Sequence, residues 1–157
     1  MDRNEIIKFF GGKFILGAAY FRIVPGRADW PADMRRMKDI GFDSVKIQVE
    51  WERVNPRKNE YFWEESDGLM DVAAKTGLKV MFQIPLETVP ERAYREHGAE
   101  RIELDRKTAP VMTLLGGIMK WSVCWDNPGL LAEAHDFVVR IVTRYKDHPA
   151  LLCWDVC

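Results

Sequence analysis

Charged and aromatic side chains stand where the hydrophobic stretches of this sequence end. They are, in chain order, Arg22, Glu50, Trp51, Glu87, Trp125, Asp126 and Asp155. Carboxylate and guanidinium groups can hydrogen-bond the hydroxyl groups of a ligand, and an indole face can stack on the apolar face of a sugar. The sequence also holds six tryptophans, which is compatible with a carbohydrate cleft. We therefore predict that these residues contact a substrate.

Most of these candidates also have a purely structural interpretation. Glu50 could pair with Arg53 or a neighbouring lysine, and Trp51 could pack between a sheet and its helices. Arg22 could form a surface salt bridge, and Glu87 could serve the cap of the short helix that follows it. Asp155 could hydrogen-bond the nearby backbone, because a carboxylate near the end of a buried strand is costly unless it is paired or used.

The composition is that of one ordinary globular domain. The chain has 157 residues, 47% of them hydrophobic and 30% charged, and its net charge is −1 from 23 basic and 24 acidic side chains. This balance argues against nucleic acid or an anionic membrane as a partner. The sequence shows no signal-peptide core and no apolar run of membrane-spanning length, so a cytoplasmic location is expected.

Cysteine and histidine spacing predicts neither a disulfide framework nor a metal site. The chain has no CxxC pair and no short cluster of histidine and cysteine. The cysteines are predicted to be small buried side chains, with a partial metal site completed by residues beyond position 157 as the alternative. The histidines are predicted to be surface or capping residues. No metal and no cofactor is predicted; the residues concerned are Cys124, Cys153, Cys157, His97, His135 and His148.

Strand-like and helix-like stretches alternate along the chain. Hydrophobic periodicity predicts strands over 13–20, 44–49, 79–84 and 150–157, and helices over 29–40, 65–76 and 127–148. Asp29 is the predicted cap of the first helix, and Gly41 and Gly77 are predicted left-handed ends of the first two. Asn127, followed by proline, is the predicted start of the third. The spacing of Thr88 and Glu91 predicts a capping box and a short helix through 95.

Four strands and three main helices in alternation predict an α/β fold, the N-terminal half of a (β/α)8 TIM barrel. A whole barrel needs about 250 residues. The expected organisation is a lead-in over 1–13 and a partial barrel domain over 14–157, truncated at the end of its fourth strand. An open doubly wound sheet is the alternative, but it would show a glycine-rich loop after the first strand. The long segment 85–127 would lie at the C-terminal ends of the strands, where sites are built.

Four strings follow one another along the chain: MKDIGFDSVKI, VKIQVEWERVNP, CWDNPGL and YKDHPALLCWDVC. In this combination and order they resemble clan A glycoside hydrolases, and most of all glycoside hydrolase family 42, the β-galactosidase-like enzymes. The likeness covers about residues 14–157. The resemblance implies a retaining glycosidase that acts on β-galactosides or related β-linked sugars. Such enzymes hold two carboxyl groups about 5 Å apart, one as nucleophile and one as acid/base.

In that clan the fourth strand ends in Asn-Glu, and this Glu is the acid/base. The resemblance places it two positions past Cys157 and places the nucleophile much further on, so the 157-residue chain by itself is expected to be inactive. Family members carry an arginine shortly before the cysteine that matches Cys124, whereas this sequence has Lys120 there. A lysine cannot make the same bidentate contact with a sugar. Some members also bind zinc through that cysteine.

Two further possibilities come from other classes of protein. The chain could be a non-catalytic half-barrel that binds sugar weakly or only associates with another chain. It could also be a different, metal-assisted barrel enzyme. The lack of clustered histidines and carboxylates at the predicted strand ends argues against this possibility. A carbohydrate is the expected small-molecule partner. A half-barrel leaves its first and last strands as open edges, so a homo-oligomer or aggregation is expected.

Overall fold

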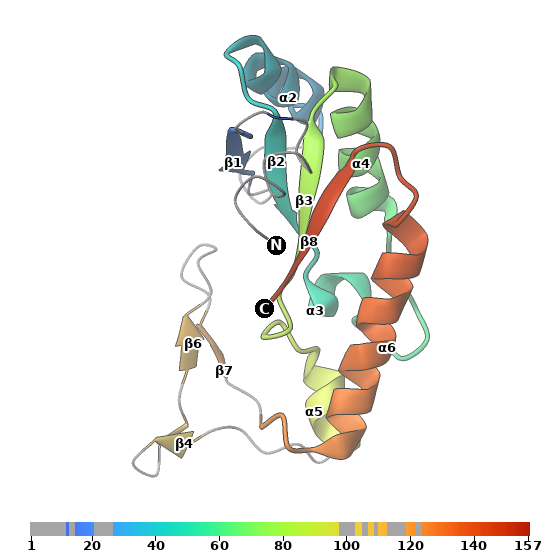
Figure 1. Cartoon of the computed structure of the whole chain (residues 1–157). Helices are drawn as coiled ribbons and strands as arrows, with labels where there is room; N and C mark the ends of the chain where they lie inside the picture. The colour runs from blue at the N-terminus through green and yellow to red at the C-terminus, as the bar shows by residue number, and fades with distance from the viewer. Residues whose placement is uncertain are drawn as a thin grey trace.

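Figure 1 shows the computed structural model of the chain. It describes residues 12, 15–20, 27–97, 103–104, 107–108, 110–112, 119–121 and 124–157. Arg22, one of the predicted substrate contacts, lies outside the described residues, as does nearly all of the predicted lead-in over 1–13. In the described part, strands and helices alternate as the sequence predicted.

A four-stranded parallel sheet forms the centre of the structure. It consists of β1 (Gly17–Ala19), β2 (Ser44–Gln48), β3 (Lys79–Ile84) and β8 (Leu151–Val156), in the order β1-β2-β3-β8. All three pairings are parallel, which confirms the predicted α/β class. A Cβ atom at Gly17 would lie 2.4 Å from the Ser44 hydroxyl oxygen and 3.1 Å from the Ser44 carbonyl oxygen, so glycine lets β1 approach β2 without displacing Ser44.

Three main helices connect the strands and cover one face of the sheet. They are α2 (Trp30–Asp39), α4 (Glu64–Thr76) and α6 (Pro128–Tyr145), and α4 and α6 lie along the same side of the strands in Figure 1. Gly41 and Gly77 have φ angles of 101° and 74°, which confirms both predicted left-handed helix ends. Two short helices, α3 (Trp51–Val54) and α5 (Glu91–His97), follow β2 and β3.

The predicted helix starts are only partly right. Asn127 caps α6, since its side-chain oxygen accepts a hydrogen bond from the Leu130 N–H at 3.0 Å. Asp29 stands at the N-cap position of α2, but its side chain makes no capping hydrogen bond. The capping box at Thr88 is wrong. The hydroxyl of Thr88 instead accepts a hydrogen bond from the Trp51 N–H and donates one to the Pro85 carbonyl. The Trp51 N–H is buried and needs an acceptor, and Thr88 supplies it.

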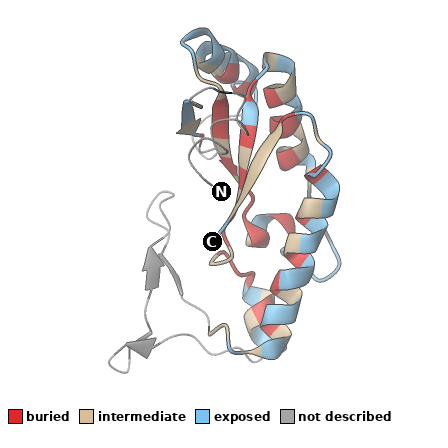
Figure 2. Ribbon diagram, in the orientation of Figure 1, coloured by how far each residue is buried: buried red, intermediate tan, exposed pale blue. Residues whose placement is uncertain are grey.

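The hydrophobic core lies between the sheet and its helices. Alternate residues of β2 and β3 are fully buried there, namely Val45, Ile47, Val80, Phe82 and Ile84. Figure 2 shows buried residues on the central strands and on the inward sides of α4 and α6. The remaining residues of the same strands point to the other face, which none of the described helices covers (Figure 1). Among the described residues, no helix is both long and apolar enough to cross a membrane.

Small strands occupy the long connection between α5 and α6. They are β4 (Glu103–Leu104), β5 (Lys107–Thr108), β6 (Pro110–Met112) and β7 (Met119–Trp121), paired antiparallel as β4-β5 and β6-β7. The two ends of this connection are joined at their base, because the Asn127 side-chain amide donates to the His97 carbonyl at 3.0 Å. The segment therefore contains small elements of its own, one of the two expectations for a connection of this length.

Candidate functional site

The C-terminal ends of three central strands lie at one level and define the candidate site. The Val49 N–H donates to the Gln83 carbonyl at 2.8 Å, and the Cys157 N–H donates to the Ile84 carbonyl at 3.3 Å. The Leu86 N–H in turn donates to the Cys157 carbonyl at 2.6 Å. Backbone pairing thus continues past the ends of β2, β3 and β8 and fixes the loops that carry the candidate side chains.

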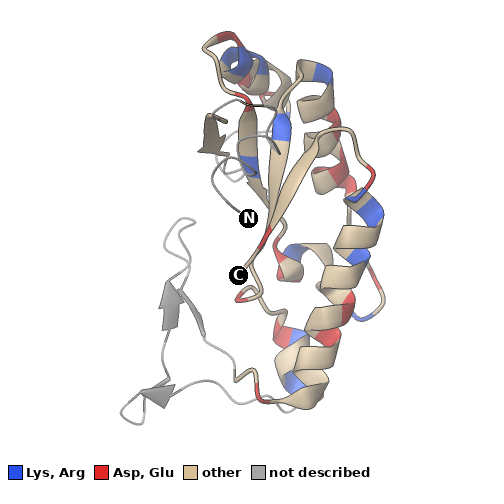
Figure 3. Cartoon of the chain, viewed as in Figure 1, with Lys and Arg blue, Asp and Glu red and all other residues tan. Residues whose placement is uncertain are grey.

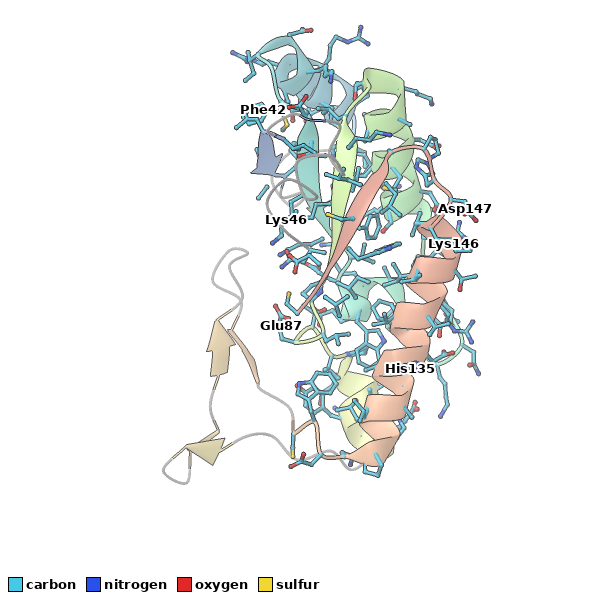
Figure 4. The ribbon with its side chains drawn as sticks, in the orientation of Figure 1. Phe42, Lys46, Glu87, His135, Lys146 and Asp147 are labelled. Carbon is cyan, nitrogen blue, oxygen red and sulfur yellow. The ribbon has the colours of Figure 1, made fainter. Side chains whose placement is uncertain are left out.

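The uncovered face of the sheet is polar near these ends. Gln48, Gln83 and Asp155 stand in one row across β2, β3 and β8. The Gln48 side-chain amide donates to the Gln83 side-chain oxygen at 2.7 Å. Lys46 stands two residues before Gln48 on β2, and its ammonium lies 2.8 Å from Asp155 Oδ2. Figure 4 labels Lys46 on the side of the strands away from α4 and α6, and Figure 3 shows the basic and acidic positions on β2 and β8.

Asp155 is therefore at the candidate site and is already paired. Its side chain is about one third exposed, as is that of Lys46. Burial, and next the negative charge of Asp155, raise the pKa of the neighbouring Cys153 thiol. The predicted alternative for Asp155 was a bond to the backbone, whereas the partner is an ammonium group from two strands away. A carboxylate held in this way can accept a ligand hydroxyl with its second oxygen.

Glu50 and Trp51 follow β2, but their side chains are buried. Glu50 is 8% exposed and lies 3.6 Å from the Arg53 guanidinium, which is the pairing named as its structural alternative. Trp51 has no exposed surface and stacks on Phe137 of α6, with ring centroids 5.3 Å apart. An indole that is fully enclosed by protein cannot stack on a sugar. The structure thus places Trp51 in the core, between the sheet and a helix.

Glu87 lies in the loop after β3 and is half-buried. In Figure 4 it stands near the C-terminal end of the chain, on the same side of the sheet as Lys46. Thr88, the next residue, fixes this loop: its hydroxyl lies 2.9 Å from the Trp51 nitrogen and 2.8 Å from the Pro85 carbonyl oxygen. Since Thr88 is 5% exposed, this link between the ends of β2 and β3 is protected from water.

The two candidates before α6 have different surroundings. Trp125 is partly buried and packs against the hydrophobic core, whereas Asp126 is exposed. Among the candidates within the described residues, Glu87 and Asp155 lie at the strand ends on the uncovered side. Glu50 lies at the same level but inside the protein.

One group of side chains has the composition of a metal site. Ligand atoms of Glu96, His97 and Glu133 lie within 4.8 Å of one another. Lys58 lies 2.8 Å from Glu96, and Arg92 lies 2.5 Å from Glu133, so each carboxylate already has a cationic partner. His97 Nε2 lies 2.6 Å from Glu133 Oε2. The contacts of Glu133 join α5 to α6, and that of Lys58 joins the loop after α3 to α5, so the three groups do not form an open cation site.

Sequence reasoning did not single out the polar row on the uncovered face. Ser44, Lys46 and Gln48 alternate with Val45 and Ile47, which is the period of a strand with one polar face. That alternation indicates a polar face on this strand, but it does not show which side chains of other strands lie beside it. The pairing of Lys46 with Asp155, more than one hundred positions away, could not be read from either strand.

Comparisons with known proteins give the same fold. Solved structures similar to this chain include the β-galactosidases of the psychrophilic Marinomonas ef1 and of the Antarctic haloarchaeon Halorubrum lacusprofundi. The sequence identities are 23% and 22%, each with a TM-score of 0.76, covering 91% of this chain and 21% of the other. Because these are (β/α)8 barrels, the four-stranded sheet is half of such a barrel.

Curated relatives are similar in sequence over most of the chain. β-Galactosidase LacZ of Heyndrickxia coagulans is 28% identical over 145 residues, which is 92% of this chain and 21% of that protein. β-Galactosidase BgaA of Thermus sp is 26% identical over 132 residues, which is 83% of this chain and 20% of that protein. The chain thus spans about a fifth of the length of the curated relatives it matches. A family model described as Beta-galactosidase, of glycoside hydrolase family 42, matches residues 21–157. The chain therefore belongs to glycoside hydrolase family 42, the Beta-galactosidase family.

Proposed function

We propose that this chain forms the N-terminal half of the barrel of a retaining glycoside hydrolase that acts on β-galactosides or related β-linked sugars. The observation that carries the proposal is the family match, which extends from residue 21 to residue 157. The polar groups at the ends of β2, β3 and β8 support it, because the site of a (β/α)8 enzyme is built at the C-terminal ends of its strands.

The catalytic carboxylates of this proposal lie outside the 157 residues. By resemblance, the acid/base glutamate stands two positions after Cys157. Side chains alternate along a strand, so that position shares a face with Asp155 and Cys157. Cys157 faces the polar row, since the Gln83 side-chain amide lies 3.1 Å from its sulfur. The glutamate would then point to the uncovered side of the sheet, where the nucleophile from a later strand can meet it at about 5 Å.

Within this chain, the proposed sugar contacts are polar groups at the C-terminal ends of the strands and in the segment before α6. Glu87 and Asp155 would accept hydrogen bonds from sugar hydroxyls, and Asp126 would do so from the segment before α6. Glu50 would act indirectly, from inside the protein, by positioning Arg53 through their ion pair. Arg22 remains a proposed contact after the first strand, and Trp125 a proposed wall of the cleft.

The activity is tested by reading the gene past the codon for Cys157. We expect Asn and Glu as the next two residues, and we expect the longer product to hydrolyse nitrophenyl β-galactoside. The 157-residue chain should release no nitrophenol above background under the same conditions. A longer product with no activity on any β-linked nitrophenyl sugar would contradict the proposed reaction.

Sugar binding without hydrolysis is tested on the 157-residue chain. Galactose titrated into labelled protein should shift the NMR signals of residues at the strand ends. Glu87→Gln should weaken this binding several-fold, because an amide accepts hydroxyl hydrogen bonds less well than a carboxylate. Glu91→Gln is the matched control, since Glu91 is exposed on α5 and pairs with Arg95 at 3.4 Å. Equal loss in both variants would argue against a role for Glu87 at the site.

A further inference from the structure

A cavity of about 440 Å³ lies between α3 and the start of α4. Its walls come from α3, from the loop that joins α3 to α4, from the first turn of α4, and from Arg27 ahead of α2. None of its lining residues belongs to a strand of the sheet, and the flanking helices α2 and α4 pack against each other. The chain therefore supplies the elements around this α3–α4 pocket. Its volume lies within the range of small-ligand sites, about 300–1,000 Å³.

Ser66 lines the α3–α4 pocket with a hydroxyl group that is not used by the fold. The residue is 1% exposed, and its hydroxyl oxygen is buried without a hydrogen-bond partner among the described residues. A serine inside a helix usually bonds a backbone carbonyl one turn earlier, and buried hydroxyl groups are in most cases paired. A ligand in the pocket with hydroxyl groups of its own would pair with Ser66 as donor or acceptor.

Charged groups of both signs stand side by side in the pocket wall. The Glu65 carboxylate lies 3.2 Å from the Arg53 guanidinium and 3.6 Å from that of Arg27. Glu64 and Glu65 occupy the first turn of α4, where acidic side chains already complement the positive end of the helix. A bound anion would meet these carboxylates. The wall thus offers hydrogen-bond donors and acceptors together, which suits the hydroxyl groups of a neutral ligand.

Phe62 gives the pocket an apolar surface. It lines the cavity together with Val54 and Pro56, and it is 44% exposed although it is a large hydrophobic residue. An exposed aromatic ring can lie against the apolar face of a sugar ring. An aromatic surface with a few convergent polar groups is the usual composition of a small-ligand site.

We propose that the α3–α4 pocket is a second sugar-binding site, which takes one unit of a β-linked oligosaccharide. Phe62 would lie against the sugar ring, while Ser66 and the pair of Arg53 with Glu65 would bond its hydroxyl groups. The choice of sugar rests on the proposed function. The pocket lies among the helices, whereas Glu87 and Asp155 lie on the uncovered side of the sheet, so the two sites are separate (Figure 4).

Galactose titrated into the labelled 157-residue chain tests the pocket by NMR. We expect it to shift the signals of residues 62–67, and we expect inorganic phosphate to leave them unchanged. Phe62→Ala should weaken this binding several-fold. Leu131→Ala is the matched control, since Leu131 is 54% exposed on α6, and it should bind as the wild type does. Signals at 62–67 that do not respond to galactose, or that respond to phosphate alone, would overturn the proposal.

Ser66→Ala separates a binding role from a structural one. It should weaken galactose binding several-fold without lowering the urea midpoint of unfolding, because the hydroxyl has no partner in the folded chain and alanine favours a helix. Undiminished binding, or weaker binding that merely follows a lower midpoint, would contradict the assignment.

The outcome for this pocket is distinguishable from that for the proposed function. Glu87→Gln should weaken only the shifts at the strand ends and leave those of residues 62–67. If the longer product hydrolyses nitrophenyl β-galactoside but galactose does not shift residues 62–67, the pocket assignment fails and the proposed function stands. If the longer product is inactive but Ser66→Ala abolishes the shifts at residues 62–67, the pocket stands and the proposed function fails.

Discussion

Asp67 is the residue that ties the second main helix to the third. Its carboxylate accepts hydrogen bonds from the Tyr145 hydroxyl at 2.7 Å and from Arg144 Nε at 2.9 Å. Burial by itself raises the pKa of Asp67, but the bonds from Arg144 and Tyr145 outweigh it and hold the pKa below its ordinary value of 3.8. Burial and the bond to Asp67 in turn raise the pKa of Tyr145.

Asp67→Asn should lower the free energy of unfolding near neutral pH by about 1–2 kcal/mol, because charge-assisted hydrogen bonds between α4 and α6 are lost. The folded-state pKa lies below the unfolded one, so this contribution is present above pH 3.8 and disappears as the pH falls below that value. Urea denaturation of both proteins as a function of pH measures it. Asp71→Asn, at an exposed position of the same helix, should change stability little. A pH-independent gap between wild type and Asp67→Asn would contradict the assignment.

Thr88 acts as a bridge between the ends of β2 and β3. Thr88→Val keeps the shape of the side chain but leaves the buried Trp51 N–H without its acceptor, which should cost about 1–3 kcal/mol of stability. Thr88→Ser retains the hydroxyl and should recover most of the loss. Chemical denaturation compares the three proteins. If serine and valine are equally destabilising, the methyl group and not the hydroxyl is what matters.

At the scale of elements, α6 depends on the residue that directly precedes it. Asn127 caps the helix through the Leu130 N–H and also holds the His97 carbonyl at the end of α5. Asn127→Ala should therefore destabilise the protein by about 1 kcal/mol or somewhat more, as loss of a helix cap does. Asn127→Asp keeps the capping oxygen but cannot donate to His97, so its thermal unfolding separates the two roles. A melting temperature for alanine equal to that of wild type would show that the cap is not needed.

At the scale of the whole molecule, stability and association should be coupled. The 157-residue chain by itself has β1 and β8 as the outer strands of its described sheet, and if it associates through them, mass action makes its melting temperature rise with protein concentration. We expect this dependence for the wild type and for Val139→Lys, whose charge stands on the exposed side of α6, and we expect it to weaken for Val156→Lys, whose charge stands on the outer strand β8. Differential scanning calorimetry over a hundred-fold range of concentration measures it. A wild-type melting temperature that is independent of concentration would point to a stable monomer.

Sequence periodicity was sufficient for the elements and their order. The four strands, the three main helices, both glycine helix ends and the cap at Asn127 follow from local signals, because each depends on residues within one or two turns of the chain. The string VKIQVEWERVNP and the three other matching strings indicated the family, and the family model matches residues 21–157. A local signal also misled, since the spacing of Thr88 and Glu91 fits a capping box that the fold uses differently.

Tertiary structure alone decided which candidate side chains lie at the strand ends on the open side. Trp51 and Glu87 both follow a strand, yet Trp51 is enclosed against Phe137 and Glu87 is only half-buried. The ion pair of Lys46 with Asp155 joins residues that are far apart in sequence and adjacent only because parallel strands align. The sequence therefore determined the type of each element and the family of the chain. Packing of the helices on one face determined which residues remained available for chemistry on the other.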